Sequence, residues 1–459
     1  MEDVLDPGIT AWMLTSASLV LLMTPGLAFF YGGMVRAKSV LNMMMMSFGA
    51  MGSIGVVYVL WGWSMSYGES VGGFFGNPFD QFGLQGTILD GNGDYIISGG
   101  LPVVVDVGFQ VTFAIITVAL ISGAIADRVK FSTWMVFTGI WATLCYFPLA
   151  HMVWGGGFLG DGPDGLAAKI FGTIGDGAEA VAQVAPIDFA GGTVVHINAG
   201  VAALVLVLLI GARKGFGKEP MRPHNLPFVM LGAGLLWFGW FGFNGGSAYA
   251  ADGGAGLAWV NTTTCTAAAI LGWLIVEKIR DGEPTSLGAA SGIVAGLVAI
   301  TPAAGDVSPV GAIALGLVAG ALCAMAVGLK HRFGYDDSLD VVGVHLVGGL
   351  VGTVALGFIA TSGGLLYGDG PKLLVVQIAI VAFAIIWTAV LTLALGLAIK
   401  YTLGWRIDED DEVSGIDRVE HGETAYEFGA SGARRSVLAT RATAHRADAS
   451  APVTEGAQA

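Results

Sequence analysis

Charged residues are scarce in this 459-residue chain, where Lys, Arg, Asp and Glu make up only 12% against 54% hydrophobic residues. A soluble domain of this length carries about twice that charged fraction. The apolar residues also stand in long blocks, without the alternation of a half-buried strand or the 3.6-residue period of a surface helix. The composition therefore excludes an ordinary soluble domain and predicts an all-α polytopic membrane protein.

Cysteines and catalytic motifs are also few. Cys145, Cys265 and Cys323 lie far apart inside apolar blocks, with no CxxC or Cys/His ligand spacing. We interpret them as small apolar packing residues and expect no metal, no other cofactor and no nucleic-acid partner. The loops show no nucleophile–base pair or phosphate-binding loop, which disfavours an enzyme. No carbonyl filter or carboxylate ring is evident, which disfavours a sodium or potassium channel.

The N-terminus lacks the basic stretch that opens a secretory signal. It begins MEDVLDPGIT, which is acidic. We therefore expect no cleaved signal peptide and interpret the first apolar block as a true membrane span.

Eleven apolar blocks are long enough to cross a bilayer as helices of about 20 residues. The 72 glycines fit this interpretation, because small residues let helices approach closely in lipid. The expected spans are 9–31, 40–66, 101–124, 132–150, 188–211, 227–249, 255–278, 286–303, 308–330, 340–360 and 373–403.

Basic residues gather in alternate connections and at the end of the last span. They are Arg36, Lys38, Arg128, Lys130, Arg213, Lys214, Lys218, Arg222, Lys278, Arg280, Lys330, Arg332, Lys400 and Arg406. The opposite connections contain only Lys169 and Lys372. Because basic loops stay in the cytoplasm, we expect a multi-pass protein of the cell membrane with its N-terminus outside and its C-terminus in the cytoplasm.

The connections expected outside are acidic, from Glu2 to Glu179. A negative field there would concentrate cations at a pore mouth. A simple solvated surface is the favoured interpretation, and the two are compatible.

The chain changes character after residue 403. An acidic run from Asp408 to Glu412 opens a segment whose middle, IDRVEHGETAYEF, is too patterned for a linker. The end is rich in Ala, Ser, Thr and Arg with few large apolar residues, which predicts disorder. We therefore divide the chain into a transmembrane domain at 1–403, a cytoplasmic tail at 404–430 and a disordered C-terminus at 431–459.

Two of the seven histidines stand deep inside expected spans. His196 lies in DFAGGTVVHINAG and His345 in DVVGVHLVGG, each among apolar and small neighbours. An ionisable side chain at that depth is costly and usually faces a protein interior or a pathway. One such histidine could equally be a hydrogen-bonded packing residue, but two in matching contexts favour a pathway.

The matching contexts predict an inverted repeat. In both segments an Asp is followed by the His, then by two residues, a small residue and Gly. The histidines fall in the fifth and tenth spans, which run in opposite directions. We therefore expect two inverted five-helix repeats, at about 9–211 and 227–360, with the functional site at their interface. The eleventh helix, 373–403, would be peripheral.

An aspartate opens each of these two spans. His196 follows Asp188 by eight residues, about 12 Å along a helix, and His345 follows Asp340 by five. The two imidazoles enter from opposite faces and can meet in the middle. A carboxylate at a helix start can cap free N–H groups, so for both aspartates a structural role is favoured over a role in transport.

Several aromatic residues form helix faces. Trp240, Phe243 and Ser247 are spaced i, i+3, i+7 in the sixth span, while Phe113 lies in the third and Trp154 follows the fourth. We expect Trp154 and Ser247 at the outer end, with Phe113 and Phe243 deeper. Rings attract a small cation and a hydroxyl accepts one of its N–H groups. Taken alone, such aromatics are more often packing or interfacial residues.

A series of segments from about residue 12 to about 430 resembles one known family, the ammonium transporters, in its Amt branch of the Amt/Mep/Rh superfamily. DFAGGTVVHINAG is the most specific of them. The segments are PGLAFFYGGMVRAKSVLNMMM, FQVTFAIITVALISGAIADR, AHMVWGGG, DFAGGTVVHINAG, MRPHNLP, WFGFNGGSA, ITPAAG, DDSLDVVGVHLVGG and HGETAY. The resemblance implies the eleven-helix fold with its inverted halves, assembled as a homotrimer with one pore per subunit.

The resemblance also implies roles for the aromatic residues. Phe113, Trp154 and Ser247 resemble the outer recruitment site for the cation. Phe113 and Phe243 resemble the stacked phenyl gate. Trp154 and Ser247 favour the Amt branch over the Rh branch.

Five further residues match the family's pore. His196 and His345 resemble its twin-histidine pair, and Asp188 resembles the acid that supports the vestibule. Trp240 and Thr301 match pore-adjacent positions.

HGETAY resembles the tail element that docks the PII signalling protein, which implies that the cytoplasmic tail is regulatory. The stretch 158–187 departs from compact members by its length. It would alter the outer mouth without touching the histidines.

These features predict transport of ammonium or ammonia, with methylammonium as an analogue, by a protein embedded in membrane lipid. A bare cation in an apolar channel carries a large desolvation cost, but NH4+, unlike K+, can lose a proton. We predict capture at the outer site, proton loss near the phenyl gate and passage of NH3 past the histidines. Whether the proton follows stays open. The alternative is an ammonium sensor acting through its tail and a PII protein, although the sequence shows no output domain after residue 430.

Overall fold

The structure is a computed structural model that describes residues 4–426. Residues 4–425 belong to one structural unit. The disorder predicted for residues 431–459 lies outside the described residues.

Within the described residues, eleven helical spans are long and apolar enough to cross a membrane, as the sequence predicted. The spans are Pro7–Met34, Val40–Tyr67, Val103–Ile125, Phe131–Trp154, Gly192–Ile210, Leu226–Gly246, Gly253–Arg280, Ser286–Ala303, Pro309–Phe333, Val342–Ile359 and Lys372–Thr402. Each overlaps one expected block. The chain is therefore a multi-pass membrane protein.

The α-helices of the first five spans are α1 (Pro7–Met34), α2 (Val40–Val57), α3 (Trp63–Tyr67), α4 (Val103–Ile121), α5 (Phe131–Trp141), α6 (Phe147–Trp154) and α8 (Asn198–Ile210). Those of the next five are α9 (Leu226–Gly246), α10 (Gly253–Arg280), α11 (Ser286–Ile300), α12 (Pro309–Ala326), α13 (Leu329–Phe333) and α14 (Val347–Ile359). The eleventh span is α15 (Lys372–Thr402).

Short non-α turns complete several spans. The π-helical turns are η1 (Tyr58–Gly62), η4 (Ala142–Tyr146), η6 (Gly192–Ile197) and η8 (Val342–Leu346). The 3-10 turns are η3 (Ser122–Ile125) and η7 (Thr301–Ala303). Both histidines singled out above lie on π-helical turns, His196 on η6 and His345 on η8.

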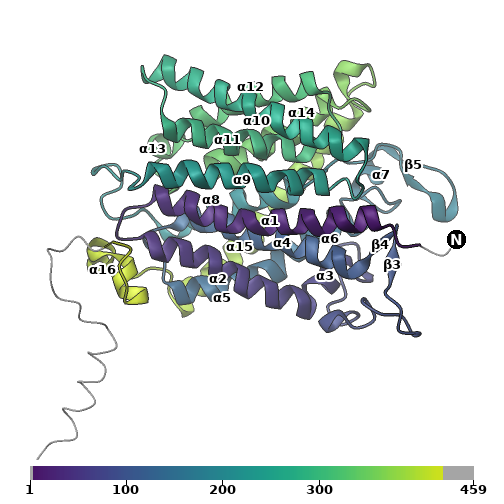
Figure 1. Cartoon of the computed structure of the whole chain (residues 1–459), viewed down its shortest axis with the longest axis horizontal. Helices are drawn as coiled ribbons and strands as arrows, with labels where there is room; N and C mark the ends of the chain where they lie inside the picture. Colours follow the sequence, from purple (N-terminus) through teal and green to yellow (C-terminus); the bar gives the residue numbers. More distant parts are fainter. Residues whose placement is uncertain (1–3, 427–459) are drawn as a thin grey trace, which may run out of the picture. The chain divides into compact units, whose positions relative to one another are not determined.

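The spans run side by side between two sides of the unit (Figure 1). We call the side where α1 begins the N-terminal side, and the opposite side, where α16 (Glu409–Ser414) lies, the α16 side. Small elements connect the spans on the N-terminal side. They are β1 (Ser70–Val71), β2 (Phe75–Gly76), η2 (Phe82–Leu84), β3 (Ile97–Ser98), β4 (Leu101–Pro102), α7 (Leu166–Phe171), β5 (Thr173–Ile174), η5 (Gly177–Glu179), β6 (Val181–Ala182) and η9 (Leu365–Tyr367).

The six strands form three separate antiparallel hairpins, β1–β2, β3–β4 and β5–β6. Their registers include Ser70 opposite Gly76 and Thr173 opposite Ala182. The long stretch 158–187 is thus folded, because α7 and the β5–β6 hairpin occupy it.

Polar side chains begin several helices at the membrane boundary. Asp6 caps α1, accepting hydrogen bonds from Gly8 N at 2.7 Å and Ile9 N at 3.0 Å. Asn225 caps α9 through Phe228 N at 3.0 Å. Such caps satisfy N–H groups that have no partner within the helix. They fix where each apolar block becomes a span.

The first helices of the two halves, α1 and α9, touch through glycines. A Cβ at Gly232 would lie 2.3 Å from Phe30 N, and one at Gly26 would lie 3.0 Å from Leu235 Cβ. The backbones therefore approach as closely as glycine permits, which is how small residues bring helices together in lipid.

The inverted repeat appears in the backbone hydrogen bonds. Before the fifth span, Ala190 N donates to Thr301 O at the end of the eighth span, at 3.2 Å. Before the tenth span, Leu339 N donates to Gly123 O at the end of the third, at 3.1 Å. One contact lies on each side of the membrane domain, and spans three and five correspond to spans eight and ten. The fold is thus two inverted five-helix halves with an added eleventh helix.

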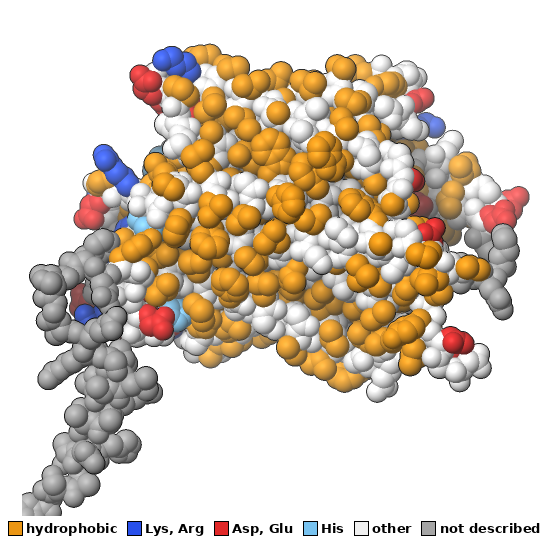
Figure 2. All heavy atoms as spheres, in the orientation of Figure 1, with side chains coloured by type: hydrophobic (Ala, Val, Ile, Leu, Met, Phe, Trp, Pro, Cys, Tyr) orange, Lys and Arg blue, Asp and Glu red, His pale blue; other side chains and the backbone are white. Residues whose placement is uncertain are grey.

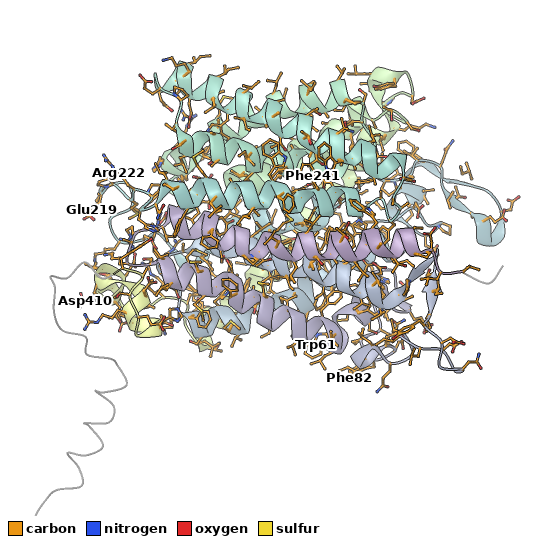
Figure 3. All side chains as sticks on the ribbon, in the orientation of Figure 1. Trp61, Phe82, Glu219, Arg222, Phe241 and Asp410 are labelled. Carbon is orange, nitrogen blue, oxygen red and sulfur yellow. The ribbon has the colours of Figure 1, made fainter. Side chains whose placement is uncertain are left out.

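The surface agrees with a membrane setting. Figure 2 shows hydrophobic side chains across the middle of the visible face, with charged side chains near the two sides. In Figure 3, Glu219, Arg222 and Asp410 lie on the α16 side, whereas Phe241 lies along a span. Phe241 stacks on the exposed Trp259, with ring centroids 4.6 Å apart.

The fourth span is longer than predicted. It continues through η4 and α6 to Trp154, so HMVW belongs to the helix and not to a following loop. Pro148 does not end it, because the proline lies just after the π-helical turn η4, where the regular α-helical hydrogen-bond pattern is already interrupted.

Candidate functional site

A cavity of about 710 Å³ lies among span ends on the N-terminal side. We call it the vestibule. Its lining includes four residues predicted from the sequence, Phe113, Trp154, Asp188 and Ser247. They come from the third, fourth and sixth spans and from the segment before the fifth.

Two phenyl rings close the inner end of the vestibule. Phe113 and Phe243 stack with centroids 4.1 Å apart and ring planes 23° apart, and both are buried. Phe113 lines the vestibule, whereas Phe243 lines a second, much smaller space beyond it. The pair therefore separates the two spaces.

Trp154 and Ser247 stand beside this pair. The Trp154 ring lies edge-on to Phe113 at 6.1 Å, and its Nε1 donates to Asp188 O at 2.9 Å. The Ser247 hydroxyl donates to Phe243 O at 2.8 Å. Because this bond uses the hydroxyl hydrogen, the Ser247 oxygen keeps lone pairs for a donor in the vestibule. Two aromatic faces and an acceptor oxygen suit a small N–H-bearing cation.

Asp188 holds the turn that leads into η6. Its carboxylate accepts from Gly191 N at 3.2 Å, Thr193 N at 3.1 Å and Val194 N at 3.2 Å. These bonds cap the start of the fifth span, as predicted. Asp188 therefore has a structural role, because its carboxylate already accepts hydrogen bonds from three backbone N–H groups.

The prediction that Asp340 caps the tenth span is wrong. Asp337 makes that cap, accepting from Val341 N at 3.0 Å and Val342 N at 2.8 Å. Asp340 instead forms an ion pair with Lys330 at 2.7 Å and has a left-handed backbone, with φ of 64°. The turn at Asp340 brings the earlier carboxylate to the helix start, which residue spacing alone does not reveal.

The two predicted histidines meet. Their Nδ1 atoms are 3.3 Å apart and their ring centroids 5.4 Å, with planes 27° apart. Both side chains are almost fully buried, with 1% of His196 and 3% of His345 exposed. One Nδ1 must donate and the other accept, so the neutral rings hold different tautomers. Nε2 of His196 is buried and has no hydrogen-bond partner among the described residues.

Trp240 and Thr301 support His196. The indole lies over the imidazole, with centroids 5.5 Å apart and planes 20° apart. Its Nε1 donates to Thr301 Oγ1 at 2.8 Å, and the Thr301 hydroxyl in turn donates to Leu297 O at 2.7 Å. A buried indole N–H needs such a partner, so Thr301 fixes the ring that covers the histidine.

Beyond the phenyl pair the space narrows to about 10 Å³, which we call the histidine passage. Apart from the two histidines its walls are apolar. All the residues that line this passage, the two histidines included, are Met23, Leu27, Ile116, Leu120, Val195, His196, Leu236, Trp240, Phe243, Val294 and His345. A space of this size holds about one water-sized molecule. The aliphatic wall residues gave no signal in the sequence, because they look like any other lipid-facing or core residue.

Sequence reasoning also missed a polar group in the vestibule. Asp106, Gln110 and Tyr249 line it, and the Tyr249 hydroxyl donates to Asp106 Oδ1 at 2.7 Å. A signal was available, since Asp106, Gln110 and Phe113 have the i, i+4, i+7 spacing of one helix face.

A buried ionic cluster joins the loops on the α16 side. Arg213 contacts Asp336 at 2.8 Å and Asp127 at 3.1 Å, and Arg36 contacts Asp127 at 3.2 Å. Burial alone would raise the pKa of Asp127, but Arg213 and Arg36 hold it below its usual value. The pKa of Asp336 is likewise lowered, because its bonds to Arg213 outweigh its burial. Both aspartates therefore stay charged, and their ion pairs hold the loops on the α16 side together.

The described part of the tail contacts the start of α2 and the loop that follows the fifth span. Asp417 accepts from Leu41 N at 3.0 Å and Asn42 N at 2.8 Å, where α2 begins. Glu412 accepts from Lys214 N at 2.6 Å. The segment 404–421 is therefore attached to the span ends by side-chain caps.

The chain is similar to known proteins over most of its length. The sequence profile of the Ammonium Transporter Family matches residues 11–426. An ammonium transporter of Mycobacterium tuberculosis is 53% identical over 95% of this chain and 94% of its own length. An ammonium transporter of Aquifex aeolicus is 47% identical over 93% of this chain and 95% of its own length.

Solved structures share the fold. A Sensor Amt Protein matches with a TM-score of 0.78 and 28% identity, over 90% of this chain and 98% of that chain. Mep2 of Saccharomyces cerevisiae matches with a TM-score of 0.76 and 30% identity, over 89% of this chain and 92% of that one.

Proposed function

The chain belongs to the Ammonium Transporter Family, and from this premise we propose that it moves ammonium from the vestibule through the histidine passage. Its relatives are named as transporters, so the activity is transport and not enzymatic catalysis. One observation carries the proposed route: two buried imidazoles, with Nδ1 atoms 3.3 Å apart, line an apolar space directly beyond a stacked phenyl pair.

Capture is assigned to Phe113, Trp154 and Ser247. An ammonium ion there would face aromatic rings and donate one N–H to the Ser247 oxygen, whose own hydrogen is already used. Asp188 supports the site by fixing the turn below Trp154, whose indole bonds to Asp188 O.

Proton loss is assigned to the region of the phenyl gate. The passage beyond Phe113 and Phe243 is apolar and about one molecule wide, so a bare cation entering it would lose its hydration without replacement. NH3 is neutral and avoids this cost. The ammonium N–H bond breaks on the vestibule side, where water accepts the proton, and NH3 continues through the passage. The proton follows separately, so each transported ammonium moves one net positive charge and gives the current measured below.

Conduction is assigned to His196 and His345. The unpartnered Nε2 of His196 offers one hydrogen bond to the passing molecule, and the ring cannot turn freely under Trp240. K+ matches ammonium in size but has no proton to lose. The passage therefore selects by chemistry, and methylammonium is expected to use the same route.

We also propose the membrane orientation and the assembly that the resemblance to the family implies. We place the vestibule outside the cell and the tail in the cytoplasm, because the basic residues cluster on the α16 side. We further propose a homotrimer with one pore per subunit, and a PII protein that docks on the tail and closes the pore. In this scheme residues 1–403 conduct and residues 404–430 regulate.

The second candidate is an ammonium sensor acting through the tail and a PII protein. It is favoured by the likeness to the Sensor Amt Protein. A sensor would bind ammonium without appreciable flux, so flux separates the two.

The test is ammonium-evoked current from proteoliposomes on a solid-supported membrane, together with methylammonium uptake. The wild type should give both, and His196→Ala and His345→Ala should each change the ammonium current. Trp259→Phe, on the exposed surface, is the matched control and should leave it unchanged. An ammonium current that neither histidine substitution alters would remove the pair from the pathway. Binding without any flux would favour the sensor.

A further inference from the structure

One carboxylate in the vestibule has no role in the route described so far. Asp106 lies in the first turn of α4, and its carboxylate lines the cavity. Its Oδ1 accepts the Tyr249 hydroxyl at 2.7 Å, and Gln110 Nε2 donates to that same hydroxyl at 2.6 Å. The three side chains form a short hydrogen-bonded chain in the cavity wall.

The bond to Tyr249 leaves the second oxygen of Asp106 available. Within residues 4–426 the carboxylate makes no other hydrogen bond and no ion pair. Tyr249 is held from both ends, because its hydroxyl accepts from Gln110 while it donates to Asp106. Oδ2 is thus an acceptor in a fixed position with no basic partner.

Asp106 differs from the other vestibule carboxylates. The cavity is also lined by Asp161, Asp188 and Asp306. Asp188 is occupied by three backbone N–H groups, and Asp161 is exposed at the rim. Asp306 follows the eighth span and, unlike Asp106, has no side-chain partner among the described residues that fixes its orientation toward the cavity.

The helix geometry connects Asp106 to the phenyl gate. Asp106, Gln110 and Phe113 lie on one face of α4, and seven residues correspond to about 10 Å along a helix. Phe109 bridges the same distance, with its ring 5.7 Å from Tyr249 and 4.8 Å from Phe113. A cation at Asp106 would therefore stand about two helical turns before the phenyl pair, on a continuous wall.

We propose that Asp106, oriented by Tyr249, is a binding residue for small N–H-bearing cations at a first position in the vestibule, before the site formed by Phe113, Trp154 and Ser247. The assignment rests on the proposed transport function. A carboxylate in a concave, partly desolvated wall attracts a monovalent cation more strongly than one in bulk water. Its bond to an ammonium N–H is charge-assisted and stronger than a neutral one.

Tyr249 is a positioning residue in this arrangement, since it acts through the carboxylate. It lies two residues after Ser247, and its backbone is left-handed, with φ of 53°. Removing its hydroxyl would free Asp106 to rotate without removing the charge. The Tyr249→Phe effect should therefore be smaller than that of Asp106→Asn and should act on affinity alone.

The experiment is a titration of ammonium-evoked current with full-length protein in proteoliposomes. Asp106→Asn should raise the half-saturating ammonium concentration about tenfold, which corresponds to about 1.4 kcal/mol, with the maximal current kept. Tyr249→Phe should raise it about threefold. Asp106→Glu keeps the charge and should recover part of the loss. Asp94→Asn is the matched control for net charge, because Asp94 is exposed and does not line the vestibule. It should stay within about twofold of the wild type.

The outcomes separate this inference from the transport proposal. If the wild type carries no current and no methylammonium, the transport proposal fails. If the wild type transports and Asp106→Asn has the half-saturating ammonium concentration of the wild type, or shifts it no more than Asp94→Asn does, the role of Asp106 is refuted. If Asp106→Asn fails to fold, Tyr249→Phe and Asp106→Glu decide, and an unchanged half-saturating concentration in both refutes the assignment.

Discussion

The pairing of His196 and His345 restricts what each ring can do. With Nδ1 atoms 3.3 Å apart in an apolar space, one ring donates and the other accepts. The outward-facing nitrogens then differ, one being an N–H donor and the other an acceptor. A neutral molecule such as NH3, which both donates and accepts, fits this alternation better than a bare metal cation.

At the residue scale, Thr301 is expected to matter through the indole that it holds. Thr301→Val removes the acceptor of Trp240 Nε1 and leaves a buried donor without a partner. We expect a destabilisation of about 1–3 kcal/mol and reduced ammonium current, because the ring stacked on His196 loses its anchor. Thermal unfolding in detergent and current measurements check this.

Thr301→Ser is the matched control, since it keeps the hydroxyl. It should retain most of the stability and current. A loss in Thr301→Ser as large as that in Thr301→Val would contradict the assignment to the hydroxyl, because Thr301→Ser keeps the hydroxyl and removes only the methyl group.

At the element scale, the two spans that contain the histidines begin in the same way. Each begins at a carboxylate that caps N–H groups, Asp188 for η6 and Asp337 for η8. The π-helical turn that follows carries the histidine. A π-helical turn contains one more residue than the regular α-helical turn, so the side chains on it point in a different direction. Such turns are frequent at functional sites.

At the element scale, Asp337 and Asp340 should respond very differently to substitution. Asp337→Ala removes two charge-assisted bonds at the start of η8 and should destabilise the protein by about 2 kcal/mol. It should also weaken transport, since His345 lies on that turn. Asp340→Ala, which loses an ion pair to Lys330 near the surface, should cost about 1 kcal/mol or less.

Melting temperatures of the two variants, measured side by side, provide the test. A larger loss from Asp340→Ala than from Asp337→Ala would contradict the capping assignment.

On the scale of the whole molecule, the tail and the spans are joined on the α16 side. Asp417 caps α2, and Glu420 accepts from Phe131 N at 2.9 Å, where α5 begins. Glu412 connects the tail to the loop after the fifth span through Lys214 N. That loop leads to Arg213, which bonds to Asp336 before the tenth span. Contacts therefore run from the tail to the spans of both histidines.

At this scale, Asp417→Ala is expected to release the tail. The two N–H groups at the start of α2 lose their acceptors, so amide exchange should rise at Leu41, Asn42 and along 409–421. Asp410→Ala is the matched control, because Asp410 is an exposed residue of α16. Hydrogen-exchange mass spectrometry measures both, and equal protection in Asp417→Ala and wild type would show that the cap does not hold the tail.

The sequence by itself determined the spans, their number and the inverted relation of the halves. Long apolar blocks can cross a bilayer only as structures that satisfy their own backbone, so block length and spacing are enough. It also identified His196 and His345, because an ionisable residue deep in an apolar block stands out. The aromatic residues and Ser247 were found by helical spacing and by resemblance to a family.

Only the tertiary structure decided which side chains meet. The cap by Asp337, the apolar wall of the histidine passage and the bond between Asp106 and Tyr249 all depend on a turn or on segments far apart in the chain. Periodicity describes one helix at a time, and an aliphatic side chain looks the same whether it faces lipid, core or pore. The distance between two residues on different spans is set by packing, which local sequence does not encode.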